Sequence, residues 1–185
     1  MSYIFEPAEQ PCLPIAGSDL SFPVHRIFCI GRNYEAHVKE MGNQMDRETP
    51  VYFLKSPHHL ALAEGQVPVP PRTADYHHEI ELVAGIKSGG TNIPQEEAMK
   101  HVFGYCVGLD MTRRDLQAIS KAKRHPWDTA KDFENCAIFT PLKPLDPGMA
   151  HDAGRIELKV NGAVRQSGDM ADHIWKLPEV IADLS

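Results

Sequence analysis

The stretch Tyr76-His-His-Glu-Ile-Glu-Leu-Val83 most strongly determines how this chain is expected to fold. Its aliphatic residues favour a β-strand bounded by polar residues. Because alternate residues of a strand point to the same face, the carboxylates of Glu79 and Glu81 are expected to converge on one patch. Two such like charges are unfavourable beside apolar neighbours unless a cation neutralises them. The alternative is that both glutamates lie on the solvated face of a half-buried strand.

A third carboxylate, Asp110, ends the apolar run Tyr105-Cys-Val-Gly-Leu-Asp110. This run predicts a strand over residues 102–110, from which Asp110 could bring a further oxygen ligand to the two glutamates. Mg²⁺ takes oxygen ligands, keeps several waters and leaves positions open for a substrate. The three carboxylates therefore form a candidate magnesium site.

The remaining segments predict a β-rich chain with short helices. Further strands are expected over residues 26–31, 51–54, 155–160 and 163–166, and helices over 93–100, 112 or 113 to 123, and 177–184. Asn161-Gly162 is a strong signal for the hairpin that joins the last two strands. Because strands outnumber helices and some neighbours connect by hairpins, the sequence favours a β-rich α+β fold over a doubly wound sheet.

The chain has 185 residues and a net charge of −6, with four cysteines that form no Cys-x-x-Cys pair. This length fits one domain, which we place at residues 25–185, after a proline-rich arm over residues 1–24. The acidic balance gives no reason to expect nucleic-acid binding. No apolar run approaches the roughly 20 residues that span a bilayer, and no secretory signal is recognised. Reduced cysteines and a cytoplasmic location are the expectation.

Two residues could form a base that activates water. His37 and Glu40 lie three apart in the helix-compatible segment 34–41, so they would share a helix face. A carboxylate beside an imidazole fixes its tautomer and raises its basicity. The alternative is an ordinary surface pair.

Three further residues could bind an anionic substrate. Arg114 can hold a carboxylate as a fork, and Gln117 can donate to an oxyanion. Both follow the Asp110 strand, although they could equally lie on a solvated helix face. Lys131 is either a counter-ion for the carboxylates or a partner for an anionic intermediate. His77 and His78 suggest zinc, but adjacent residues on a strand point to opposite faces and are not expected to bind one ion together.

The order of several short motifs resembles that of the fumarylacetoacetate hydrolase family. The motifs are Gly31-Arg-Asn-Tyr34 with His37 and Glu40, Phe53-Leu-Lys55, His78-Glu-Ile-Glu-Leu82, Gly104-Tyr, Asp110-x-x-x-Arg114-Asp-x-Gln117, Trp127 with Lys131, and Val160-Asn-Gly162 with Gln166. The resemblance covers roughly residues 26–185. Within the family, the sequence is most similar to the short acylpyruvate hydrolases, including the bacterial fumarylpyruvate hydrolases of gentisate catabolism.

The resemblance implies a mixed β-sandwich or roll, usually a homodimer. It implies that Glu79, Glu81 and Asp110 hold Mg²⁺ or Mn²⁺. It also implies that His37 and Glu40 form the base on a mobile lid, and that Arg114, Gln117 and Lys131 contact the substrate. The substrate would be a 2,4-diketo acid, most simply fumarylpyruvate, which water splits into fumarate and pyruvate.

Other functions remain open from the sequence. The same scaffold supports oxaloacetate decarboxylation and isomerisation of unsaturated 2-oxo diacids, and a non-catalytic dimeric binding protein is a further alternative. Family members usually continue with a Pro-Gly-Asp turn and a Thr-Gly-Thr-Pro segment after the point that Ser185 occupies here. The expectation is therefore a domain that lacks its C-terminal part.

Overall fold

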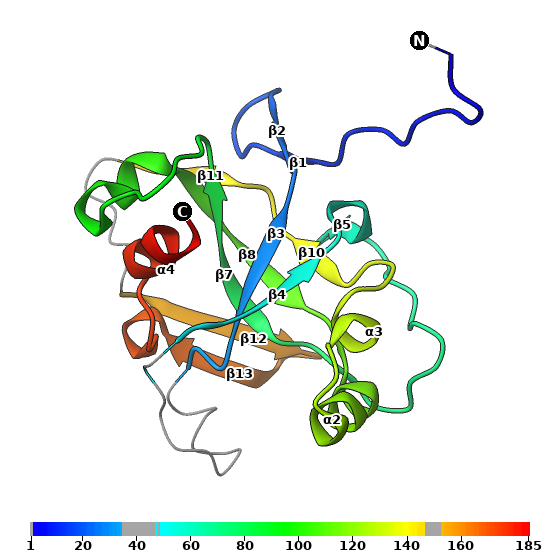
Figure 1. Cartoon of the computed structure of the whole chain (residues 1–185). Helices are drawn as coiled ribbons and strands as arrows, with labels where there is room; N and C mark the ends of the chain where they lie inside the picture. Colours follow the sequence, from blue (N-terminus) through cyan, green and yellow to red (C-terminus); the bar gives the residue numbers. More distant parts are fainter. Residues whose placement is uncertain (1, 35–46, 48, 147–152) are drawn as a thin grey trace.

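The computed structural model describes residues 2–34, 47, 49–146 and 153–185 (Figure 1). Its main sheet is organised around the long strand β8 (Val102–Asp110). Along one edge, β8 pairs antiparallel with β7 (Ile80–Ile86). Along the other edge it pairs antiparallel with β10 (Ala137–Phe139) and β11 (Lys143–Pro144). β5 (Leu60–Leu62) extends the sheet by pairing parallel to β10.

Four antiparallel ribbons and six short helices complete the described fold. The ribbons are β1 (Cys12–Pro14) with β2 (Ser21–Pro23), β3 (Ile27–Gly31) with β4 (Val51–Lys55), β6 (Tyr76–His77) with β9 (Thr112–Arg113), and β12 (Arg155–Val160) with β13 (Ala163–Asp169). The α-helices are α2 (Arg114–Lys123), α3 (Asp128–Lys131) and α4 (Leu177–Leu184). The 3₁₀ helices are η1 (Pro57–His59), η2 (Gln95–His101) and η3 (Met170–Asp172).

Apolar side chains pack on both faces of the main sheet because neighbouring residues of β8 point in opposite directions. On one face, Cys106 is buried in a cluster with Ile27 of β3 and Leu13 of β1. On the other face, Tyr105 is buried with Ile181 of α4. The sheet is thus covered by strands on one side and by η2 and α4 on the other, and the predicted β-rich α+β class is confirmed.

The arm and the domain that the sequence separates at residue 24 share one core. Leu13 and Val24 are buried in the cluster that also contains Ala137 and Phe139 of β10. Ile15 forms a bridge to Leu142, and Ala16 N donates to Leu142 O at 2.9 Å. The division of the chain into an arm and a catalytic domain at residue 24 remains a proposal.

The structure confirms most of the predicted elements, including the Asn161-Gly162 hairpin and the helix over 177–184. The segment expected as an α-helix over residues 93–100 is instead the 3₁₀ helix η2. The backbone N–H of Asn92 and that of Ile93 donate to Ser185. These contacts with the end of α4 hold the chain before η2, so it begins later than predicted. Among the helices of the described residues, none combines the length and apolar character needed to cross a membrane.

Replacing Gly104 with alanine is expected to destabilise the fold by about 3 kcal/mol or more. A Cβ atom at Gly104 would lie 2.1 Å from Lys143 O, which is a backbone atom that cannot rotate away. β11 would have to separate from β8. Urea unfolding measures the loss, with Gly89→Ala as the control because a Cβ at Gly89 meets nothing within 4 Å. Equal stability of the two variants would contradict the close approach of β8 and β11.

Candidate active site

The register of β7 and β8 brings three carboxylates to one face of the sheet. Ile80 pairs with Leu109 and Glu81 with Gly108, which sets Glu79 opposite Asp110. The backbone confirms this placement, because Asp110 N donates to Glu79 O at 2.8 Å. Glu81 lies two residues after Glu79, which directly precedes β7, and the negative charges of Asp110 and Glu79 both act on its carboxylate. The convergence predicted for these carboxylates is thus present in the structure.

Lys131 places its ammonium group between two of these carboxylates. It lies at the end of α3, and its side chain is only 2% exposed. Nζ is 2.6 Å from Glu79 Oε2 and 2.6 Å from Asp110 Oδ2, and it donates to Thr112 Oγ1 at 2.7 Å. Because the Lys131 ammonium is buried and bonded to three oxygen atoms, it belongs to the site and is not a surface lysine that lies near it.

Lys55 is a second buried cation of the site, and sequence reasoning assigned it no role. Its Nζ lies 2.9 Å from Asp110 Oδ1 and donates to the backbone oxygens of Met111 and Lys131. Burial by itself would lower the pKa of Lys55, but the Asp110 carboxylate, together with smaller contributions from Cys136 and Cys29, raises it overall. The signal available in the sequence was a lysine that directly ends the apolar strand Val51–Leu54.

The two glutamates differ in their electrostatic environment. Burial opposes the charged form of Glu79, but the ammonium of Lys131 and the guanidinium of Arg114 hold its pKa well below the ordinary value. Burial raises the pKa of Glu81 to about 8, and the negative charges of Asp110 and Glu79 add to this effect. Within the described residues, no hydrogen bond or ion pair reaches the Glu81 carboxylate. Among the three carboxylates, Glu81 is therefore the one without an ion-pair partner in the described part of the chain, although the charge of Lys131 still acts on it.

The two residues predicted to bind substrate lie on α2 at the rim of this cluster. Arg114 forms an ion pair with Glu79 Oε1, and its Nη1 donates to Gln117 Oε1 at 2.6 Å. Gln117 is buried. The guanidinium is thus held beside the carboxylates with a partner on each side. The two other residues predicted for the site, His37 and Glu40, lie outside the described residues.

Gln166 of β13 fixes the backbone on both sides of Glu79. Its side-chain Nε2 donates to His78 O at 3.0 Å, and its Oε1 accepts from Ile80 N at 2.9 Å. The amide thereby pairs with the start of β7 as a neighbouring strand would. Gln166 was part of the motif pattern in the sequence, but its contact with residues 78 and 80 depends on tertiary structure.

Replacing Gln166 with alanine is expected to cost about 1–3 kcal/mol of stability, because it leaves partly buried backbone groups of residues 78 and 80 without their partner. If Glu79 is a metal ligand, as the sequence predicts, Mn²⁺ affinity should fall as well, because Glu79 loses its fixed backbone. Thermal unfolding and calorimetric titration with Mn²⁺ measure the two effects. Gln66→Ala, a change at an exposed position, is the control. A variant with lowered stability and wild-type Mn²⁺ affinity would show that Gln166 does not position Glu79.

Comparison with known proteins finds a matching family and several similar proteins. The profile of the fumarylacetoacetate (FAA) hydrolase C-terminal family matches residues 26–185. A fumarylpyruvate hydrolase of a Ralstonia species is 42% identical over 147 residues, which are 78% of this chain and 76% of that protein. A mitochondrial oxaloacetate tautomerase of Arabidopsis thaliana is 40% identical over 163 residues, which are 86% of this chain and 71% of that protein.

A solved structure shows the same fold over the whole chain. The crystal structure of fumarylpyruvate hydrolase from Pseudomonas aeruginosa, in complex with Mn²⁺ and pyruvate, superimposes with a TM-score of 0.94. The two sequences are 42% identical, and the match covers 100% of this chain and 81% of the other.

Proposed function

This chain belongs to the fumarylacetoacetate hydrolase family, and from that premise we propose that it hydrolyses a C–C bond of an acylpyruvate with the help of a divalent metal ion. The proposed substrate is fumarylpyruvate, an intermediate of aromatic catabolism, and the products are fumarate and pyruvate. The observation that carries the proposal is the convergence of Glu79, Glu81 and Asp110 around buried cations. The Mn²⁺ and pyruvate bound by the Pseudomonas aeruginosa relative support it.

The residues present suit a hard cation. All three acidic side chains offer carboxylate oxygens, which Mg²⁺ and Mn²⁺ prefer. Burial and the negative charges of Asp110 and Glu79 raise the pKa of Glu81, and the positive charge of a divalent ion would oppose both effects. Glu79, Glu81 and Asp110 would hold the ion. When bound, it would supply Lewis-acid stabilisation for the negative charge that develops on the pyruvate part of the substrate.

The side chains have separate parts in the proposed reaction. Arg114 binds a carboxylate of the diketo acid and is oriented by Gln117. His37, with Glu40 as its partner, takes a proton from the water that attacks the distal carbonyl carbon. The bond between that carbon and the pyruvate methylene then breaks, and the pyruvate enolate takes up a proton. The ammonium of Lys131 offsets the negative charge as it forms.

The assay that tests this function follows loss of the enol absorbance of fumarylpyruvate in the presence of Mg²⁺, with separate measurement of pyruvate and fumarate. Equal amounts of the two products, abolished by EDTA, are expected. Absence of turnover in Mg²⁺ and in Mn²⁺ would contradict the proposal.

Replacing His37 with alanine is expected to slow hydrolysis by about 10²–10⁴-fold, because a general base contributes that much to a rate. Binding of Mn²⁺ should be unchanged, because the proposed ligands are all carboxylates. Steady-state kinetics and Mn²⁺ titration separate the two effects, and His25→Ala, at an exposed position, is the control. Wild-type hydrolysis by the His37 variant would remove this residue as the base.

Oxaloacetate chemistry is the second candidate, because the Arabidopsis relative is an oxaloacetate tautomerase. Oxaloacetate carries the same carboxylate and adjacent keto oxygen, but tautomerisation moves only a proton and decarboxylation needs no attacking water. An oxaloacetate assay run in parallel separates the candidates. Enol–keto exchange without pyruvate would indicate a tautomerase, and pyruvate with CO₂ a decarboxylase.

We also propose that the chain acts as a homodimer. Phe28 and Leu54 are paired across β3 and β4, and they are 38% and 54% exposed. An exposed apolar pair of this kind suits a subunit contact. Light scattering on the purified protein tests the proposal.

A further inference from the structure

A second group of side chains that could hold a metal ion lies outside the carboxylate site. It consists of His59 at the end of η1, Asp132 directly after α3, and Cys136 directly before β10. One ligand atom from each of the three residues can be chosen so that all lie within 4.8 Å of one another. None of these residues belongs to the proposed active site.

The three side chains are oriented toward a common point. His59 Nδ1 lies 2.6 Å from Asp132 Oδ1, and Cys136 Sγ lies 3.8 Å from the same oxygen. A turn directs the thiol there, because Asn135 adopts a positive φ of 59° and Cys136 N donates to Phe133 O at 3.0 Å. The ligand atoms therefore face one another before any ion binds.

The surroundings allow an ion to enter and to complete its coordination. The side chains of His59 and Asp132 are 25% and 28% exposed, whereas Cys136 is fully buried. Glu134 Oε1 lies 3.7 Å from His59 Nε2, the ring nitrogen that faces away from Asp132, so this carboxylate could orient the imidazole while a water molecule completes the coordination. An ion would approach from the imidazole side and meet the thiol at the bottom of the cluster.

We propose that His59, Asp132 and Cys136 form a site for Zn²⁺, separate from the all-carboxylate site of Glu79, Glu81 and Asp110. A thiolate, an imidazole and a carboxylate are a ligand set that zinc prefers, whereas Mg²⁺ prefers oxygen alone. On binding, the thiol proton passes to solvent. The two sites would thus bind different metal ions, with Zn²⁺ at the site that contains the thiolate and Mg²⁺ or Mn²⁺ at the all-carboxylate site.

Zinc at this place would join the two segments that carry the buried lysines of the active site. Ser56, which follows Lys55, donates its backbone N–H to Asp132 Oδ1 at 2.8 Å, and Asp132 itself follows Lys131. Met111, which follows Asp110, donates its N–H to Cys136 O at 2.9 Å. The bound ion would therefore fix the backbone beside Lys55, Lys131 and Asp110.

The test uses Co²⁺ as the probe on purified protein from which bound metals have been removed, with excess Mg²⁺ present to occupy the carboxylate site. One equivalent of Co²⁺ is expected to give the near-ultraviolet charge-transfer band of a cobalt–thiolate bond, and Zn²⁺ should remove it. One equivalent of Zn²⁺ should also raise the unfolding temperature. Absence of the band in the wild-type protein would overturn the proposal.

Variants identify the ligands. Cys136→Ser is expected to abolish the band. His59→Ala should weaken Co²⁺ binding by more than about tenfold, since even outer partners of a metal site contribute that much. Should the serine variant fail to fold, the affinity of His59→Ala still decides. A band that persists in Cys136→Ser, or unchanged affinity in His59→Ala, would overturn the proposed ligand set.

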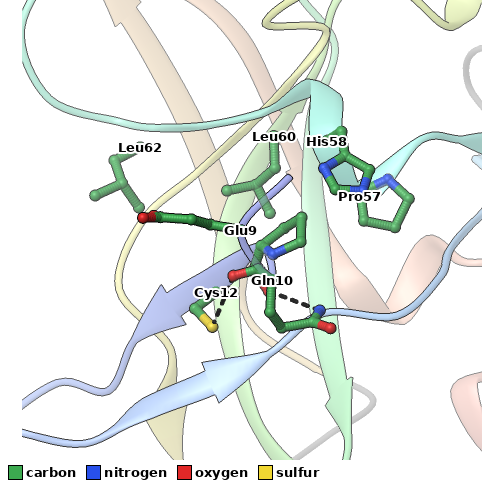
Figure 2. Close-up of a pocket in the computed structure, with 8 residues that line it drawn as sticks. Glu9, Gln10, Cys12, Pro57, His58, Leu60 and Leu62 are labelled. Carbon is green, nitrogen blue, oxygen red and sulfur yellow. Dashed lines mark hydrogen bonds between the residues drawn. The ribbon is translucent and has the colours of Figure 1, made fainter. Parts of the chain in front are cut away.

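The chain offers matched controls next to the cluster. His58 and Cys12 line a separate surface hollow with Glu9 and Gln10 (Figure 2). His58→Ala and Cys12→Ser should both retain the band. Glu81→Gln should retain it as well, which separates this inference from the proposed function. Loss of the band in Cys12→Ser would assign it to the wrong thiol.

Discussion

Metal-free Lys131→Met protein is expected to be less stable than the wild type by about 3–5 kcal/mol, the usual cost of removing one partner of a buried ion pair. Lys131 is 2% exposed and bonded to Glu79, Asp110 and Thr112, so methionine would leave two carboxylates without this cation. Because methionine retains much of the aliphatic part of the lysine side chain, the loss of stability should reflect mainly the missing charge. Urea unfolding in the presence of EDTA measures it.

Divalent ions should restore part of this loss. If the carboxylates form the metal site, Mn²⁺ would replace the missing positive charge, and the unfolding temperature of the variant should rise more steeply with Mn²⁺ than that of the wild type.

The control for this series is Lys143→Met. Lys143 forms an exposed ion pair with Asp146 at 3.2 Å, so its loss should cost no more than about 1 kcal/mol. Equal effects of the two lysine substitutions would mean that Lys131 does not neutralise the buried carboxylates. Absence of any recovery with Mn²⁺ would count against the metal site.

Glu81→Gln is expected to have opposite effects on activity and on stability. Hydrolysis should fall by about three orders of magnitude, because a metal ion supplies several kcal/mol of stabilisation to the developing charge. The metal-free variant should nevertheless be more stable than the wild type at pH 8, on the order of 2 kcal/mol, because the neutral amide avoids the cost of ionising a buried carboxyl group.

The pH dependence follows from the direction of the shift. The pKa of Glu81 is about 8 in the fold, above its ordinary value of 4.5, so the unfolded chain releases this proton at lower pH. The contribution of Glu81 to the free energy of unfolding, measured in EDTA, should therefore be fully present below pH 4.5. It should be lost progressively as the pH rises to 8. The Glu81→Gln variant should lack this component. Glu96→Gln, at an exposed position, is the control. Parallel pH profiles for Glu81→Gln and the wild type would contradict the raised pKa.

Much of the fold could be predicted from local patterns. The strands over residues 102–110 and 155–160, the Asn161-Gly162 turn and the helix over 177–184 all follow from periodicity and turn chemistry. Local patterns failed at residues 93–100, where contacts with Ser185 hold the chain before a 3₁₀ helix. They also missed η1 and β5, because β5 has only three residues and is held by parallel pairing with the distant β10.

By itself the sequence determined which residue types the site contains and that Glu79 and Glu81 share a face, since the period of a strand is a local property. Only the tertiary structure decided that Asp110 lies opposite Glu79, that Lys55 and Lys131 stand among the carboxylates, and that Gln166 holds the start of β7. The cluster of His59, Asp132 and Cys136 was equally hidden, because one ligand comes from a distant segment and the others meet through a turn. The physical reason is that strand register and packing between segments fix such contacts, and neither leaves a repeating pattern in the chain.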